Sequence, residues 1–184
     1  YVLDVTYTWT DDGSDHSWTT AESWNLDSVP GPADVVSIGS GYSVTNAQKE
    51  FGTLTIATNT TVVFGEDGLQ GASTITCAGT IDRTGVWRLI GGGAITLTRT
   101  GRFGTGITWL DLQGADLNFQ DGASFGSRFS FEHRTANTFG FTLSEAGFTP
   151  LELGQLHSGG TTWADATYTI DVSDYNPSNG TSIT

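Results

Sequence analysis

Short apolar pairs recur along residues 50–153 at a nearly constant interval. One residue separates the two members of each pair, so both members would lie on the same face of a strand. The pairs are Leu54/Ile56, Ile75/Cys77, Ile95/Leu97, Leu117/Phe119 and Phe139/Phe141. Their first members are 21, 20, 22 and 22 residues apart. A constant period in this range is typical of a solenoid, in which each coil buries its apolar side chains against the next.

The period predicts an all-β fold, a short β-solenoid with an additional N-terminal strand. The 184 residues suffice for one domain with a hydrophobic core. We expect a single domain at 1–184, with an N-terminal strand or arm at 1–9, a Trp-rich loop or cap at 10–33, solenoid coils at 34–153 and closing strands at 154–184. A jelly-roll β-sandwich is the alternative, since it also consists of many short alternating strands.

The first nine residues, YVLDVTYTW, alternate between polar and apolar positions. This pattern predicts a half-buried strand with one apolar face. The strand either caps the first coil or acts as an arm that pairs with another subunit. In the second case the assembly strand would use its apolar positions, Tyr1, Leu3, Val5, Tyr7 and Trp9.

The polar segment that follows contains an acidic run and two tryptophans, and each of these features has two possible roles. The carboxylates of Asp11, Asp12 and Asp15 allow a calcium ion, but an acidic hairpin turn fits as well because the full calcium-loop spacing is missing. Trp18 and Trp24 either plug the open end of the stack or stack on sugar rings.

Composition and charge narrow the class of protein. The net charge of −13 disfavours nucleic acid and anionic membranes as partners. An acidic, Thr- and Gly-rich chain with one Lys is typical of exported proteins, so we expect an extracellular or cell-surface location. No apolar run is long enough for a membrane-spanning helix, and the lack of Met indicates a mature or excised segment. The single Cys77 lies on the apolar phase and is expected to be a small core residue.

All six arginines fall within residues 83–134, where only four acids occur. Such a concentration predicts an arginine ladder on one face, suited to sulfate or carboxylate groups. The alternative is that these arginines neutralise the acidic remainder, within the chain or across an interface. A glycan-binding surface would combine the ladder with tryptophans: Arg88, Arg99, Arg102, Arg128, Arg134, Trp18, Trp24 and Trp109.

Few residues point to catalysis, and we expect no enzyme. Asp111 and Asp116 are the candidates for a paired-carboxylate hydrolase, although both also fit the polar phase of their strands. A lyase acting on acidic polysaccharide could use His133 with Arg134 and Arg128. The chain has neither zinc-ligand spacing nor a nucleophile elbow.

Two further patterns concern the core and the surface. Phenylalanines concentrate in the last third and predict a stacked aromatic core: Phe119, Phe125, Phe129, Phe131, Phe139, Phe141 and Phe148. Asn59 and Asn179 each begin a glycosylation sequon, a pattern that arises often by chance in Thr-rich chains.

The order of motifs near the N-terminus resembles a known opening. Trp24 is followed by Val29-Pro30-Gly31-Pro32, Asp34-Val35-Val36-Ser37-Ile38, Gly41-Tyr42-Ser43-Val44 and Gly52-Thr53-Leu54-Thr55-Ile56. This order resembles the start of the eight-glycine domain of extracellular β-helix proteins, and similar openings occur in bacterial exported β-helical and autotransporter-type adhesins. The resemblance covers residues 18–98. It implies a right-handed β-helix in an extracellular setting and transfers no catalytic residue.

Two functional hypotheses follow. The first is an extracellular structural subunit or adhesin module that assembles with copies of itself, head to tail, into a filament, pilus-like fibre or surface layer. Its physical basis is that the open ends of a β-stack join other chains unless they are capped. The second is a carbohydrate-binding module, or a small lyase, that acts on acidic polysaccharide. Calcium is the one cofactor that the residues suggest.

Overall fold

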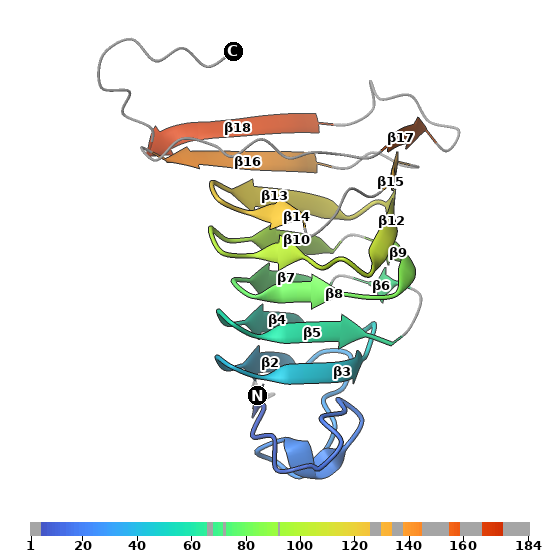
Figure 1. Ribbon diagram of the computed structural model, residues 1–184, viewed down its shortest axis with the longest axis vertical. Helices are drawn as coiled ribbons and strands as arrows, with labels where there is room; N and C mark the ends of the chain where they lie inside the picture. Colours follow the sequence, from blue (N-terminus) through green and yellow to red (C-terminus); the bar gives the residue numbers. More distant parts are fainter. Residues whose placement is uncertain are drawn as a thin grey trace.

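The predicted all-β solenoid is confirmed. The computed structural model describes residues 5–65, 68–71, 73–91, 93–125, 130–133, 138–144, 155–158 and 167–174. In these ranges the chain forms three parallel sheets whose strands stack along one axis (Figure 1). The helical content of this part is one turn of 3₁₀ helix, η1 (Ala21–Ser23).

The first sheet runs almost the whole length of the stack. It contains eight strands in the order β1–β2–β4–β7–β10–β13–β16–β18. Their bounds are β1 Thr6–Thr8, β2 Val35–Ile38, β4 Thr53–Ile56, β7 Thr74–Cys77, β10 Ala94–Leu97, β13 Asp116–Gln120, β16 Thr138–Ser144 and β18 Thr167–Asp174.

The other two sheets have five strands each, in the orders β14–β11–β8–β5–β3 and β17–β15–β12–β9–β6. The second sheet consists of β3 Ser43–Ala47, β5 Thr61–Phe64, β8 Thr80–Asp82, β11 Arg102–Phe103 and β14 Ser124–Phe125. The third sheet consists of β6 Leu69–Gln70, β9 Gly85–Ile90, β12 Ile107–Gln113, β15 Ser130–His133 and β17 Gln155–Ser158. One coil therefore passes through all three sheets, as β4, β5 and β6 do before β7 begins the next coil.

Strand direction rules out the sandwich alternative. Every pairing between named strands is parallel. A jelly roll is built from antiparallel strands, so that alternative is wrong for this chain.

The apolar pairs seen in the sequence are aligned in the first sheet. Successive Cα partners are Leu54, Ile75, Ile95, Leu117 and Phe139, and likewise Ile56, Cys77, Leu97, Phe119 and Phe141. Each residue therefore packs on its counterpart one coil away, which is why the period appears in the sequence. Cys77 is buried as expected, and burial raises the pKa of its thiol to about 12.

The stack extends past the bounds of 34–153 that the period suggested. At the N-terminal end β1 pairs with β2 and forms the first rung of the first sheet. At the other end β17 and β18 pair with β15 and β16. The period hides the first rung because the chain leaves the stack at residues 10–33 before it returns to form β2.

Aromatic rings form a continuous column through the interior. Neighbouring ring centroids lie 4.8–6.4 Å apart, within the range of favourable ring contacts. The column runs through Trp9, Trp24, Trp18, Phe51, Phe64, Trp87, Phe103, Phe125, Phe119 and Phe141. The predicted aromatic core is thus present and begins at the N-terminal end. Phe129 and Phe148 lie outside the described residues, as does the side chain of Phe131.

Candidate functional site

The N-terminal edge of the first sheet is covered by residues 10–33, called here the cap loop. The Thr8 amide donates to Asn25 Oδ1 at 2.9 Å, and the Asn25 amide donates to the Thr8 carbonyl at 3.0 Å. Asn25 Nδ2 also donates to the Thr6 carbonyl, at 3.4 Å. These bonds use the backbone groups on the outer side of β1, which would otherwise face another strand.

The same loop covers the second sheet. The Trp18 amide donates to the Thr45 carbonyl, and the Thr45 amide donates to the His16 carbonyl, both at 2.8 Å. Ser17 and Thr45 form a parallel bridge, so the cap loop adds a short rung to β3. On the third sheet the Gln70 amide of β6 donates to the Lys49 carbonyl at 2.9 Å. Each sheet thus has hydrogen bonds across its N-terminal edge from this chain.

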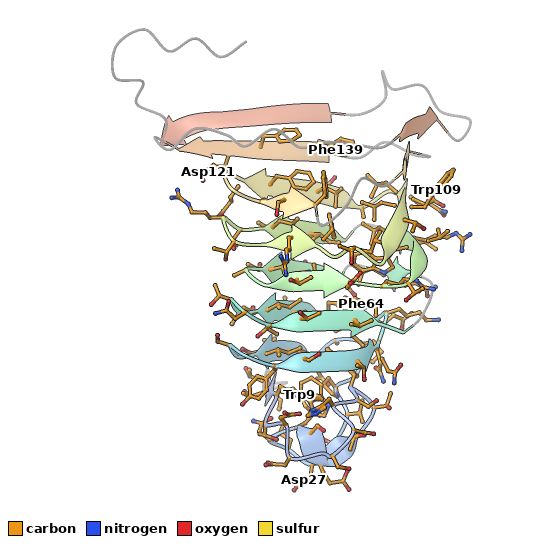
Figure 2. The ribbon with its side chains drawn as sticks, viewed as in Figure 1. Trp9, Asp27, Phe64, Trp109, Asp121 and Phe139 are labelled. Atoms are coloured by element: carbon orange, nitrogen blue, oxygen red, sulfur yellow. The ribbon has the colours of Figure 1, made fainter. Side chains whose placement is uncertain are left out.

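Three tryptophans fill the space beneath these edge contacts. Trp9, Trp18 and Trp24 are at most 2% exposed, and Trp24 contacts the other two rings edge to face. The Trp24 indole N–H donates to the Trp18 carbonyl at 2.8 Å. Trp18 and Trp24 are therefore a plug, and their ring faces are not available for sugar stacking in this structure. Figure 2 shows Trp9 at this end, between the coils and the cap loop.

The proposed assembly strand has most of its described apolar face in contact with its own chain. Trp9 is buried, and the part-buried Tyr7 packs against the core and shares a hydrogen bond with Ser28 at 3.2 Å. Val5 is exposed, whereas Tyr1 and Leu3 lie outside the described residues. Pairing of β1 with another subunit would therefore require either β1 to leave β2 or the cap loop to leave the outer edge of β1.

The acidic run holds the cap loop in shape. Asp11 lies 2.6 Å from His16 Nδ1, and the Asp15 carboxylate accepts from the Ser17 amide at 3.1 Å and from the Thr20 hydroxyl at 2.8 Å. The Ser17 amide first, and then the Thr20 hydroxyl, lower the pKa of Asp15. Asp12 is exposed. No metal-holding group of three side chains occurs in the part of the chain that is described, and calcium stays a prediction.

The described arginines do not form the predicted ladder. Arg88 lies on β9 in the third sheet, Arg102 on β11 in the second, and Arg99 in the turn before β11. Residues stack only when they are about one coil apart, whereas Arg88 and Arg99 are 11 residues apart and Arg99 and Arg102 only three. Arg128 and Arg134 lie outside the described residues.

Two of these arginines face buried carboxylates one coil away. Arg99 Nη2 lies 3.1 Å from Asp121 Oδ2, and Arg88 Nε lies 3.6 Å from Asp111 Oδ2. The side chains of Asp121 and Asp111 are only 7% and 2% exposed. A buried carboxylate needs such a partner, so these contacts agree with the alternative in which arginines neutralise acids within the chain.

Arg88 shares the outer face of the third sheet with Trp109. Strand alternation places both there, because Trp87 and Leu110 point into the core. Asp111 lies on the same face and also accepts from Gln113 Nε2 at 2.9 Å. Trp109 and Asp121 lie on opposite sides of the stack (Figure 2). The predicted glycan-binding residues are therefore divided between separate surfaces.

The candidate catalytic residues do not meet in the described part. Asp111 belongs to β12 in the third sheet, whereas Asp116 belongs to β13 in the first. Asp116 Oδ1 accepts from the Thr138 amide at 2.6 Å. Only the backbone of His133 is described, and its proposed partners Arg134 and Arg128 are not. The buried Asp111 and the part-buried Asp116 thus lie in different sheets and do not form a carboxylate pair.

Sequence reasoning missed a groove along the corner between the first and second sheets. This corner groove has a volume of about 500 Å³ and is lined by Thr58, Asn59, Ala78, Gly79, Thr80, Thr100, Arg102 and Ser124. Thr80, Arg102 and Ser124 are successive Cα partners, each 22 residues from the next. Applying the coil period to polar positions would have found this row.

Asn59 is exposed in its turn, and its glycosylation stays a prediction, as does that of Asn179 outside the described residues.

Comparisons with family models, curated proteins and solved structures found no match. In the residues that the structure describes, no helix is both long enough and apolar enough to cross a membrane.

Proposed function

We propose that this chain is a rigid structural module of an extracellular or cell-surface protein of the adhesin type. The observation that carries the proposal is the closed N-terminal end of a stack with a continuous aromatic core. The acidic, Lys-poor composition supports an exported location. The resemblance of residues 18–98 to the opening of extracellular β-helix proteins supports the same setting.

The cap loop changes how self-assembly would work. Head-to-tail stacking requires free strand edges at both ends of the solenoid. Here Asn25 covers β1, and residues 16–18 pair with β3. We therefore expect the N-terminal end to be closed to other copies of the chain. A filament, pilus-like fibre or surface layer that uses this end would form only after the cap loop opens.

Sedimentation velocity combined with negative-stain electron microscopy tests this proposal. The wild-type chain is expected to show no association through its N-terminal end at any concentration. A variant with Trp24→Ala and Asn25→Ala loses the plug and the edge contact, so it is expected to associate end to end. Gln48→Ala removes an amide near the same end and serves as the control.

A labelling experiment identifies the end that is used. Leu26 is 43% exposed in the cap loop, so Leu26→Cys places a reactive thiol there while Cys77 stays buried. The closed-end proposal would be overturned if the otherwise wild-type chain formed filaments and a bulky label on Leu26→Cys blocked their formation. Repeating the runs with a calcium chelator tests whether the acidic run binds calcium.

A further inference from the structure

The corner groove runs parallel to the solenoid axis across four coils. Thr58 and Asn59 line it from the turn after β4, Gly79 from the turn after β7, and Thr100 from the turn after β10. Ser124 of β14 lines it on the next coil. Because parallel strands lie 4.7–4.9 Å apart, three steps between coils give a length of roughly 14 Å. This length suits an extended oligomer better than a single small molecule.

Among the described residues that line the groove, Arg102 is the one that carries a charge. Its Nε donates to the Thr80 hydroxyl at 2.8 Å, which fixes an otherwise exposed side chain. Among the described residues, Arg102 forms no ion pair, in contrast to Arg88 and Arg99. A guanidinium held at Nε still presents its two terminal nitrogens, which match the two oxygens of a carboxylate or sulfate.

The other polar groups of the groove accept and donate hydrogen bonds without charge. The Thr100 hydroxyl donates to the Ala78 carbonyl at 2.7 Å, so its oxygen lone pairs remain able to accept. Asn59, Thr58 and Ser124 add an amide and two more hydroxyls. A row of neutral hydrogen-bonding groups beside one fixed cation matches a ligand that carries many hydroxyls and an occasional negative charge.

The negative charge of the rest of the chain limits which anionic ligands can reach Arg102. The net charge is −13, and Arg99 at the same corner is already paired with Asp121. A strongly anionic polymer would be repelled by most of the surface. A chain of sugars with spaced carboxylate or sulfate groups can bring one anion to Arg102 and contact the rest of the groove through hydroxyls.

We propose that the corner groove binds a linear acidic oligosaccharide, with a carboxylate or sulfate on Arg102 and sugar hydroxyls on Asn59, Thr100 and Ser124. The site shares only Arg102 with the predicted glycan surface, because it uses neither the tryptophans nor an arginine ladder. It does not depend on whether the chain assembles, so failure of one proposal leaves the other intact.

Titration followed by amide NMR and calorimetry tests the groove. The probes are a galacturonate hexamer in which most carboxylates are methyl-esterified and only spaced ones are free, its fully esterified neutral form, a sparsely sulfated oligosaccharide of equal length and inorganic sulfate. We expect the acidic oligomers to shift the amide signals of Asn59, Gly79 and Thr100. Arg102→Gln should weaken their binding at least tenfold, whereas Arg102→Lys should retain part of it. Lys49→Gln removes the same charge from another surface and should change binding less than twofold.

The probes also distinguish the sources of the anion. Tighter binding of either acidic oligomer than of inorganic sulfate supports the proposal and identifies the acidic group. Equal binding by inorganic sulfate would reduce the groove to a simple anion site and overturn it. Equal losses in Arg102→Gln and Lys49→Gln, or signal shifts confined to Trp109 and the third sheet, would overturn it as well. Thermal unfolding confirms that each variant is folded, which the exposure of Arg102 leads us to expect.

Discussion

Thr8 and Asn25 exchange two hydrogen bonds across the N-terminal edge of the first sheet. One uses the Asn25 side-chain oxygen, at 2.9 Å, and the other uses its backbone amide, at 3.0 Å. A single residue of the cap loop thereby imitates the next strand of the sheet. Exposed strand edges are sites of unwanted pairing, so this contact stabilises the chain and also limits its partners.

Replacing Asn25 with Ala is expected to destabilise the fold modestly. The substitution removes the acceptor of the Thr8 amide but leaves that edge accessible to water. The expected loss is therefore about 1 kcal/mol of unfolding free energy, measured by denaturant titration. Gln48→Ala should change the free energy by less than half of that. Equal effects of the two substitutions would show that the edge contact contributes nothing specific.

The aromatic column predicts a contrast between two tryptophans. Trp87 is fully buried and lies between Phe64 and Phe103, whereas Trp109 lies partly exposed on the outer face of the third sheet. Trp87→Ala should cost about 3–5 kcal/mol, the usual range for a large aromatic truncated in a core. Trp109→Ala should cost much less. Chemical unfolding of both variants checks this order, and a larger loss for Trp109 would contradict the column as the main core element.

Gly79 shows why some turns between sheets require glycine. A Cβ at this position would overlap the Thr60 carbonyl and lie 2.6 Å from the Ala57 carbonyl, both part of the neighbouring coil. Gly79→Ala should therefore destabilise the protein by about 1–3 kcal/mol, as overpacking does. At Gly39 the nearest atom would lie at 3.5 Å, on the Tyr42 ring, so Gly39→Ala should be neutral or slightly stabilising. Comparison of the two melting temperatures tests the close approach of the coils.

The sequence predicted the part of the fold in which the coils have equal length. Leu54, Ile75, Ile95 and Leu117 stand one coil apart, so a simple count of residues found their register. The strand at residues 1–9 was predicted, but its place on the first coil was left open because the cap loop separates β1 from β2. The contact of Asn25 with the edge of β1 depends on how the cap loop folds back over the sheet. The spacing of residues along the chain does not predict this contact.

The functional sites were harder to predict than the fold. The sheet on which a residue lies depends on its position within its coil, and two residues share a position only when they are about one coil length apart. Arg88, Arg99 and Arg102 are close in sequence, yet the coil carries Arg88 to a sheet different from that of Arg102. Ser124 is distant from Arg102 in sequence but is its direct neighbour. Clustering along the chain therefore does not predict which residues share a surface, whereas a separation of one coil period does.

Asp15 should make the cap loop sensitive to acid. Hydrogen bonds from Ser17 and Thr20 lower its pKa below the ordinary value of 3.8, so folding favours its charged form. This stabilisation is fully present above the ordinary pKa and is lost as the pH falls through the lowered value. Asp15→Asn removes the titration. The wild type should therefore melt at a higher temperature than this variant near neutral pH, and the gap should close as the pH falls below 3.8 through the lowered pKa.

Asp12→Asn removes one charge from the same acidic run and provides the comparison. Asp12 is exposed, so its substitution should not reproduce the pH-dependent gap. A gap of the same sign and size in both variants would show that a carboxylate stabilises the cap loop equally at either position. It would then exclude a specific role for the bonds that Asp15 accepts.

Native-state hydrogen exchange at the N-terminal edge tests the central claim of a closed end most directly. The amides of Thr8, Trp18 and Thr45 are bonded between the cap loop and the first coils. We predict that all three exchange slowly in the monomer and that Asn25→Ala accelerates Thr8 far more than Thr45. If Thr8 and Trp18 instead exchange as fast as amides in an unstructured chain, while the interior rungs stay protected, the end is open and the account is contradicted.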